Sequence, residues 1–208
     1  MFISFEGIDF CGKSTQIELL KNFLIKRGNE VEIIREPGGT EISEIIRNIL
    51  LDKKNLEMFM EAEILLFAAA RAQLVREKIR PFLNKGIYVI SDRFHDSTTA
   101  YQGFGRGISL ESVQHIHKIS VGNTIPDMTF LIDIPVDVAQ KRKIQLKQSD
   151  LDRIEVADAG FFENVRAGYL YLAEHESRFR VINGTLPIEK IHKEIIDELT
   201  LFEKKENR

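Results

Sequence analysis

The sequence has a single cysteine, Cys11, among its 208 residues. One cysteine cannot form a disulfide within the chain, which fits a reducing, cytoplasmic environment. The N-terminus lacks the pattern of a secretory signal, because no basic segment precedes its apolar residues and Glu6 interrupts them. The longest unbroken apolar run, from Ile64 to Ala70, is far too short to cross a bilayer. These absences predict a cytoplasmic protein with no membrane partner.

The sequence also lacks an excess of charge of either sign. Lysine and arginine total 29 residues against 32 aspartate and glutamate residues, and the net charge is -3. This balance gives no support for a nonspecific partner such as nucleic acid or a membrane surface, so any preference for anions must be local. No internal repeat is visible, and the length and the 43% hydrophobic content are ordinary for one α/β domain. We expect a single domain over residues 1–208.

One strong motif is present, G-x-x-x-x-G-K-S, which begins at Gly7 and ends at Ser14. It follows an apolar run and precedes an amphipathic segment, which is the strand, loop and helix context of a phosphate-binding loop. The glycines let backbone N–H groups face phosphate oxygens, Lys13 reaches the outer phosphates of ATP, and Ser14 offers a hydroxyl to Mg²⁺. A plain glycine turn is the alternative. The predicted nucleotide-binding residues are Gly7, Ile8, Asp9, Phe10, Cys11, Gly12, Lys13, Ser14 and Thr15.

Apolar runs alternate with helical periodicity along the chain. Each of five expected strands is followed by a segment with helical spacing. The strands are expected at residues 1–5, 31–34, 87–91, 128–133 and 179–182. This alternation predicts an α/β fold with three layers, in which a five-stranded parallel sheet carries helices on both faces.

Two of the helices carry specific expectations. Thr40 is expected to cap a helix, and the inner face of that helix is expected to carry Ile42, Ile45, Ile46 and Ile49. A long helical stretch is expected over residues 57–83, broken near Pro81. Within this stretch Phe67 and Arg71 are four residues apart and share a face, where they could hold a flat ligand. Core packing is the alternative for the phenylalanine.

Polar segments follow two of the strands. Open parallel sheets bind their ligands at the carboxyl ends of the strands, and both the turn from Arg35 to Thr40 and the pair Asp92 and Arg93 are expected there. A plain connector is the alternative for the turn. We interpret Asp92 as a metal contact and Arg93 as a phosphate contact, with a surface ion pair as the alternative. The segment 95–107 is rich in Ser, Thr and Gly and is expected to be a loop that forms a ligand wall.

A basic and polar segment follows the fourth strand. The expected helix ends near Lys141, Arg142 and Lys143, and residues 147–153 have the composition of a mobile polar flap. We expect a lid at about residues 142–158 that folds an arginine onto the phosphates of ATP. A solvated helix face is the alternative. His115 and His117 are two residues apart and do not face each other on a helix, so they do not form a metal pair.

These segments together resemble the bacterial thymidylate kinase family, a group of P-loop nucleoside monophosphate kinases. The resemblance spans nearly the whole chain and implies transfer of the γ-phosphoryl group of ATP to dTMP, giving dTDP, with Mg²⁺ as cofactor. It also implies a homodimer. The matching segments are Phe5 to Asp9, Arg35 to Thr40, Leu66 to Ala69 with Arg71 to Gln73, Ser91 to Arg93, Ala100 to Gly103, Asp152 to Glu155, and Val165 to Leu170.

The resemblance implies roles for individual residues. The phenylalanine that matches Phe67 stacks on thymine, and the arginine that matches Arg71 bonds the O4 edge. Arg93 would hold the dTMP phosphate with Arg47 as a further candidate, and Asp92 would lie near Mg²⁺ with Ser14. Thr98 and Gln102 would lie near the base, and Tyr101 would lie against the sugar. Asp9 and Glu36 would lie near the 3′-hydroxyl. The full substrate-binding set is Asp9, Glu36, Pro37, Arg47, Phe67, Arg71, Arg93, Ser97, Thr98, Tyr101 and Gln102.

Some positions depart from the family pattern. The loop carries Phe10 and Cys11 where small residues or an arginine usually stand, so the charge-stabilising arginine is expected in the lid, with Arg142 and Arg153 as candidates. The expected catalytic set is therefore Lys13, Asp92, Arg93, Arg142 and Arg153. Ala70 replaces an aspartate that usually precedes the matched arginine, which leaves open what supports Arg71.

The cysteine in the loop and two rival functions add further expectations. Cys11 lies near a helix N-terminus and Lys13, which favours a reactive thiol, and a buried inert thiol is the alternative.

A kinase for another nucleoside monophosphate is the nearest rival function. A nucleotide-dependent switch is the second, although the sequence has no Asn-Lys-x-Asp tetrad.

Overall fold

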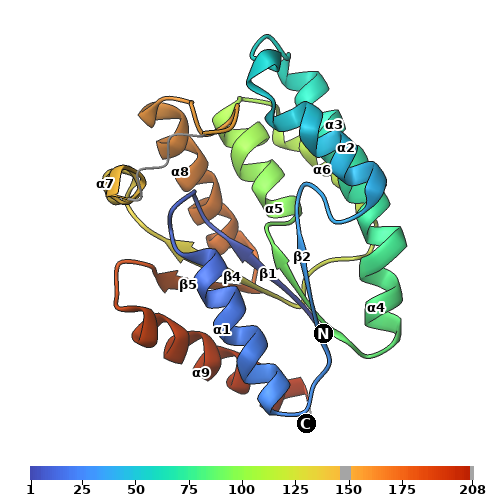
Figure 1. Cartoon of the computed structure of the whole chain (residues 1–208), viewed down its shortest axis with the longest axis vertical. Helices are drawn as coiled ribbons and strands as arrows, with labels where there is room; N and C mark the ends of the chain where they lie inside the picture. The colour runs from blue at the N-terminus through green and yellow to red at the C-terminus, as the bar shows by residue number, and fades with distance from the viewer. Residues whose placement is uncertain (146–150, 207–208) are drawn as a thin grey trace.

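A five-stranded sheet with the strand order β2-β3-β1-β4-β5 lies at the centre of the computed structural model, which describes residues 1–145 and 151–206 (Figure 1). Every neighbouring pair of strands is parallel. The strands are β1 Phe2–Glu6, β2 Val31–Arg35, β3 Tyr88–Asp92, β4 Met128–Asp133 and β5 Phe179–Asn183. The predicted five-stranded parallel sheet is therefore confirmed.

Helices cover both faces of this sheet. Figure 1 shows α1 and α9 together on one side, and α5 and α8 on the other. The α-helices are α1 Lys13–Lys26, α2 Glu41–Leu51, α3 Met60–Leu74, α4 Arg80–Asn84, α5 His95–Thr98, α6 Leu110–Ser120, α7 Val136–Gln145, α8 Ala159–His175 and α9 Ile188–Glu206. Shorter segments are the 3₁₀ turn η1 Lys53–Asn55 and the π-helical segments η2 Val75–Ile79 and η3 Thr99–Gly105. This is the predicted three-layer arrangement. Within the described residues no helix has the length and apolar character needed to cross a membrane.

The central strands β1 and β4 are buried along almost their whole length. Ile3, Phe5 and Phe130 are fully buried, as expected for strands of a parallel sheet that helices cover on both faces. Ser4 and Glu6 are polar exceptions within β1, and both are 0% exposed. Buried polar groups need hydrogen-bond partners, so these two residues indicate a buried hydrogen-bond network at the carboxyl end of β1.

The face that α2 presents to the core was predicted wrongly. Thr40 does cap the helix, because its hydroxyl accepts a hydrogen bond from Ser43 N at 3.2 Å. However, Ile42, Ile45 and Ile49 are 52%, 57% and 43% exposed, whereas Ser43 and Leu50 are buried. The Ser43 hydroxyl donates to the Ala70 carbonyl of α3 at 2.8 Å, so the small polar side of α2 faces its neighbour. An apolar stripe marks one face of a helix, but it does not show whether that face packs on the core of the same chain.

Two other helical predictions need correction. The stretch predicted to break near Pro81 is helical throughout from Met60 to Asn84, and the wide turns of η2 come just before the proline, which has no backbone N–H to donate. The segment 95–107 was predicted as a loop, yet most of it forms α5 and η3. Its Ser, Thr and Gly residues have low helix propensity, and tertiary packing overrides that preference, since η3 packs extensively against α8.

The predicted lid is only partly described. The helix α7 ends at Gln145, and residues 146–150 of the lid lie outside the described residues. In the part that follows, Arg153 is only 4% exposed, so the polar composition of the expected flap did not indicate how deeply this side chain is buried. Its backbone N–H donates to the Leu51 carbonyl at 3.1 Å and so ties this segment to the end of α2.

Candidate active site

The phosphate-binding loop joins β1 to α1 and curls through backbone conformations that favour glycine. Gly7 and Gly12 have φ values of 135° and 102°, and a Cβ atom on Gly7 would lie 2.5 Å from the Ile132 carbonyl oxygen. Lys13 lies folded onto the loop, where its Nζ donates to the carbonyl oxygens of Gly7 at 3.0 Å and Ile8 at 3.3 Å. The loop therefore has the shape that the motif predicts, with α1 beginning directly behind it.

Ser14 and Asp92 meet at the mouth of this loop. The Ser14 hydroxyl lies 3.4 Å from Asp92 Oδ2, although the two residues come from α1 and from the end of β3. A hydroxyl and a carboxylate are oxygen donors of the kind that Mg²⁺ prefers, and Mg²⁺ keeps several waters besides its protein ligands. No group of three or more His, Cys, Asp or Glu side chains in the described part of the chain could hold a metal by itself. The residues present thus fit an ion that phosphate oxygens and water help to hold.

A cavity of about 470 Å³ opens beside the loop at the carboxyl ends of β1, β2 and β3. Every residue of the predicted substrate-binding set lines it, together with Lys13, Ser14 and Asp92. The lining also includes Arg35 from the predicted ligand-side turn and Asp152, Ile154 and Glu155 from the predicted lid, together with Leu51 and Phe94, which the sequence did not single out. Residues far apart in the sequence, such as Phe67 and Gln102, therefore face one space beside the phosphate-binding loop.

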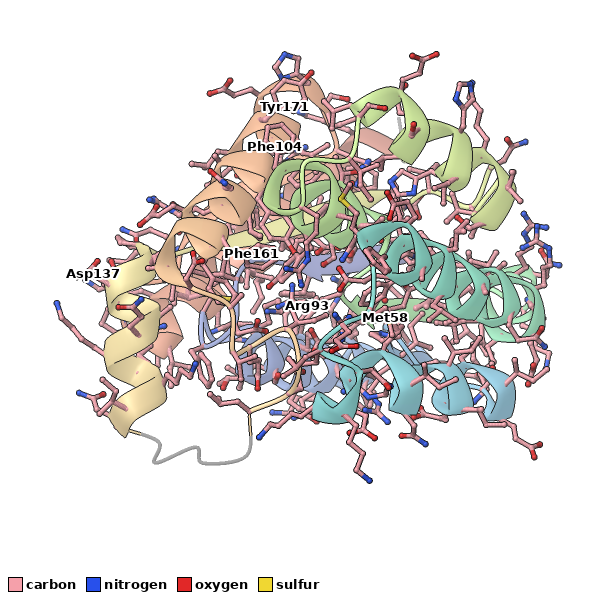
Figure 2. The ribbon with its side chains drawn as sticks, turned by 90° about the horizontal axis from the view of Figure 1, so that it is seen from above. Met58, Arg93, Phe104, Asp137, Phe161 and Tyr171 are labelled. Atoms are coloured by element: carbon pink, nitrogen blue, oxygen red, sulfur yellow. The ribbon has the colours of Figure 1, made fainter. Side chains whose placement is uncertain are left out.

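Arg93 is the cation best fixed in this cavity. Its backbone is in the left-handed region with φ 68°, which is uncommon outside glycine. Its Nη2 donates to Asp9 Oδ1 at 2.6 Å, and its guanidinium lies 5.0 Å from the ring centroid of Tyr101. Burial opposes ionisation of Asp9, but Arg93 and Lys13 outweigh it and hold the pKa of Asp9 below its usual range. Figure 2 shows Arg93 near the centre of the molecule.

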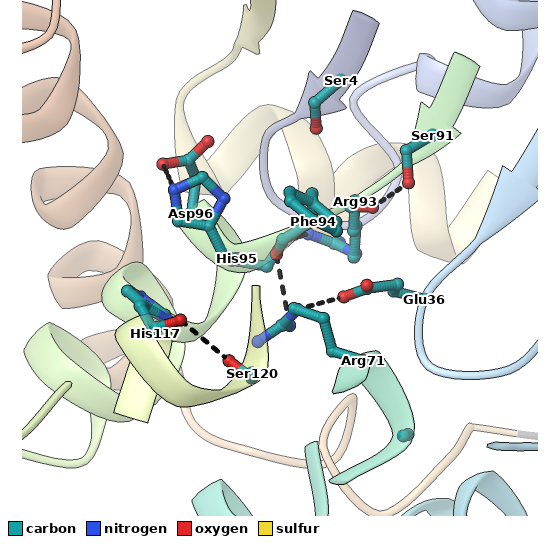
Figure 3. Close-up of polar contacts among 12 residues, drawn as sticks. Ser4, Glu36, Arg71, Ser91, Arg93, Phe94, His95, Asp96, His117 and Ser120 are labelled. Atoms are coloured by element: carbon teal, nitrogen blue, oxygen red, sulfur yellow. Dashed lines mark hydrogen bonds and ion pairs between the residues drawn. The ribbon is translucent and has the colours of Figure 1, made fainter. Parts of the chain in front are cut away.

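Arg71 has a carboxylate partner despite the alanine at position 70. Its Nε donates to Glu36 Oε2 at 2.5 Å, and Nη2 lies 3.4 Å from the Phe94 carbonyl oxygen (Figure 3). Glu36 therefore supplies the support that the substitution at Ala70 left open. Burial raises the pKa of Glu36 to about 7, although Arg71 counteracts it. Arg71 Nη1 and Glu36 Oε1 are buried without a hydrogen-bond partner among the described residues, so both remain able to bind a ligand.

The structure separates the two lid arginines. Arg142 lies beside the phosphate-binding loop, where its Nη1 donates to the carbonyl oxygens of Phe10 and Cys11, each at 3.2 Å. Arg153 instead forms a buried ion pair, with its Nη2 2.5 Å from Glu63 Oε2. Neither side chain lines the cavity. Glu63 was not foreseen, because nothing in the sequence around it indicates that Gln102, Arg106 and Arg153 converge on it.

Two further features differ from the sequence expectations. Cys11 is 1% exposed, and its Sγ lies 3.6 Å from Lys13 Nζ, which supports the buried thiol rather than the reactive one. The sequence indicated no role for Glu6 in the site, yet it is a fully buried carboxylate beside the cavity. Burial, reinforced by the charge of Asp96, raises the pKa of Glu6 to about 7, while Ser97 and Arg93 act in the opposite direction. The signal that could have revealed it is a glutamate at the end of an apolar strand.

Comparison with known proteins agrees with this geometry. The family model described as thymidylate kinase matches residues 5–195. The chain is 48% identical to the thymidylate kinase of Kosmotoga olearia, over 99% of this chain and 98% of that protein. It is likewise 48% identical to the thymidylate kinase of Thermosipho africanus, over 94% and 95% of the two chains. The crystal structure of thymidylate kinase from Ehrlichia chaffeensis superposes with a TM-score of 0.77 at 35% identity, covering 96% of this chain and 98% of that one. This chain therefore belongs to the thymidylate kinase family.

Proposed function

We propose that this chain transfers the γ-phosphoryl group of ATP to dTMP, giving dTDP and ADP, as a cytoplasmic step of nucleotide synthesis. Besides family membership, one observation carries the proposal. A single cavity of about 470 Å³ joins the phosphate-binding loop to every residue expected to contact dTMP. A donor nucleotide in the loop and an acceptor in the cavity would thus lie next to each other, which is the arrangement that direct phosphoryl transfer needs.

The acceptor side of the cavity offers groups that suit a thymine nucleotide. Phe67 provides a flat apolar face, and the unpartnered Nη1 of Arg71 is a donor for a carbonyl oxygen of the base. The buried hydroxyl of Thr98 also has no hydrogen-bond partner among the described residues and can donate or accept. Arg93 and Arg47, which line the same cavity, supply positive charge for the phosphate of dTMP.

The chemistry asks for alignment and charge neutralisation more than for covalent work by the protein. Lys13 would bind the outer phosphates of ATP, and Arg93 would hold the acceptor phosphate against them. Mg²⁺, held by Ser14 and Asp92 when bound, would neutralise phosphate charge and orient the transferring group. Arg142 is already beside the loop and is our first candidate for the arginine that stabilises the transferring group. Arg153 would have to leave Glu63 to take that role.

We also propose that the functional unit is a homodimer. Isoleucines 42, 45 and 49 of α2 are exposed together with Leu65 of α3 at 59% and Ile119 of α6 at 76%. The helix α3 packs against both α2 and α6, so these side chains belong to one helical layer. A second copy of the chain would cover this apolar layer. Sedimentation velocity should show a dimer that Ile45→Glu weakens, whereas Ile25→Glu, at an exposed position on α1, should leave it intact.

Replacing Arg93 tests the proposed assignment of the acceptor site. In an assay that couples ADP release to dTMP phosphorylation, Arg93→Ala should lower kcat/KM for dTMP by about 10² or more, since a charged positioning group is lost. Arg27→Ala, which removes an exposed ion pair with Glu203 at the end of α1, is the matched control and should behave as the wild type. A kcat/KM for dTMP within about threefold of the wild-type value in Arg93→Ala would overturn the assignment.

A further inference from the structure

Glu6 is surrounded by hydrogen-bond donors. Its Oε1 accepts from the Ser4 hydroxyl at 2.9 Å and from the backbone N–H of Phe94 at 2.7 Å. Its Oε2 accepts from the Ser97 hydroxyl at 2.6 Å and from the Tyr169 hydroxyl at 3.1 Å. These partners come from β1, α5, α8 and the residue that follows Arg93. A carboxylate so satisfied is a fixed anchor, because every one of its contacts would have to be broken to move it.

Two of these donors also hold Arg93. Its Nη1 donates to the Tyr169 hydroxyl at 2.9 Å, to the Ser97 hydroxyl at 3.2 Å and to the Gly7 carbonyl at 2.9 Å. The hydroxyls of Ser97 and Tyr169 are themselves 2.7 Å apart. A guanidinium can only donate and an ionised carboxylate can only accept, so the hydroxyl lone pairs face Arg93. Each hydroxyl has one proton, and the two contacts with Glu6 and the contact between the hydroxyls share these two protons. The two hydroxyls thus relay the position of Glu6 to the head group of Arg93.

The backbone of Arg93 is held by the same carboxylate. The N–H of Phe94 belongs to the peptide group that follows Arg93, and it donates to Glu6. On the other side, the Ser91 hydroxyl donates to the carbonyl oxygen of Arg93 (Figure 3). These bonds hold a residue whose φ of 68° is unfavourable for an arginine, and such conformations persist only where the surroundings determine them. Glu6 therefore constrains Arg93 both at its main chain and, through two hydroxyls, at its guanidinium.

We propose that Glu6 and Tyr169 are positioning residues that hold Arg93 in the conformation that receives the phosphate of the acceptor nucleotide. The inference rests on the role proposed for Arg93. A free arginine side chain loses about 2 kcal/mol of rotamer entropy when it is fixed. An anchor that fixes the side chain before the ligand binds removes this entropy cost from binding. It also keeps the guanidinium, and with it the bound phosphate, in one position relative to ATP. Neither Glu6 nor Tyr169 lines the cavity itself.

Comparing dTMP with thymidine tests the proposal, because thymidine has the same base and sugar but no phosphate. Affinities would be measured by calorimetry at pH 8, above the pKa of about 7 that burial gives Glu6. Tyr169→Phe should weaken dTMP binding about tenfold, the usual effect of losing a hydrogen bond to a charged group, while thymidine affinity stays within about twofold. Glu6→Gln should act in the same direction. Tyr171→Phe is the control, since it removes a hydroxyl from the same helix at a residue that is 39% exposed.

Arg93→Ala completes the experiment. It should remove most of the preference for dTMP over thymidine, with the remainder due to Arg47, and Tyr169→Phe added to it should then have no further effect. If Tyr169→Phe weakens dTMP and thymidine equally, its role is only structural and the inference is overturned. If Tyr169→Phe loses no affinity for either ligand, the inference is overturned as well, whether or not Glu6→Gln folds. If Arg93→Ala keeps the preference for dTMP, the proposed role of Arg93 fails and the inference fails with it. If Arg93→Ala weakens dTMP binding but Tyr169→Phe does not, the inference about Glu6 and Tyr169 fails while the proposed role of Arg93 stands.

Discussion

Replacing Glu63 with alanine is expected to destabilise the protein more than replacing its partner Arg153. Glu63 is 1% exposed and receives hydrogen bonds from Gln102 at 2.9 Å, from Arg106 at 3.2 Å and from Arg153 at 2.5 Å. Burial opposes its ionisation, but these partners lower its pKa, so the carboxylate is charged at neutral pH. The ion pair with Arg153 is therefore formed between two charges that are both hidden from water.

The two substitutions leave different groups without a partner. In Glu63→Ala the guanidinium of Arg153, whose side chain is 3% exposed, keeps its bond to the Leu50 carbonyl at 2.7 Å as its one remaining hydrogen bond among the described residues. Removing one partner of a buried ion pair costs about 3–5 kcal/mol. In Arg153→Ala the carboxylate of Glu63 still has Arg106 and Gln102, so we expect a cost of about 1–2 kcal/mol, as for a lost hydrogen bond to a charged group.

Urea unfolding followed by circular dichroism measures both costs. Glu61→Ala is the matched control, because Glu61 is an exposed glutamate in the same helix and should change the free energy of unfolding by less than about 0.5 kcal/mol. Equal costs for Glu63→Ala and Arg153→Ala, or a cost below about 1 kcal/mol for Glu63→Ala, would refute the reasoning. A fall in kcat for Arg153→Ala of about 10² with unchanged stability would instead place Arg153 at the transferring phosphoryl group.

Three further outcomes are expected. Arg142→Ala should lower kcat more than it raises KM for dTMP in steady-state assays, because Arg142 contacts the phosphate-binding loop, and an unchanged kcat would contradict this. Burial lowers the pKa of His95 from 6.5 to about 4, so between these values only the unfolded chain takes up the proton and stability is lost as the pH falls. His95→Asn should remove about 2 kcal/mol of that loss between pH 7 and 4.5 in urea unfolding, and an acid sensitivity equal to that of the wild type would argue against a buried neutral imidazole. Because Cys11 is 1% exposed, iodoacetamide should label it about 100-fold more slowly in the folded protein than in urea, and mass spectrometry showing fast native labelling would speak against its burial.

Sequence patterns predicted the parts of this protein that depend on local signals. The five strands and the phosphate-binding loop follow from apolar runs, glycine spacing and the lysine at position 13, which act within a few residues of each other. The cavity lining could be anticipated because the carboxyl ends of parallel strands share one edge of a sheet, which brings Glu36 and Arg93 together. Their roles in binding remain predictions.

Long-range packing accounts for what the sequence did not reveal. The apolar stripe of α2 was assigned to the wrong side, because periodicity locates a stripe but not its partner. The bond between Glu6 and Tyr169 joins residues 163 positions apart, and that between Glu63 and Arg153 joins residues 90 apart. The residues of each pair are too far apart in the sequence for a local pattern to predict their contact. Arg153 was expected in a mobile polar flap for the same reason, since the segment is polar in composition although the Arg153 side chain is buried.

The most direct test of the account is a screen of phosphoryl acceptors. Purified protein would be incubated with ATP and Mg²⁺ together with dTMP, dUMP, UMP or CMP, and the products would be separated by ion-exchange chromatography. We expect dTMP to give dTDP and ADP in equal amounts and to have the highest kcat/KM of the four. A higher kcat/KM for UMP or CMP, or ADP release that proceeds at the same rate without any acceptor, would contradict it.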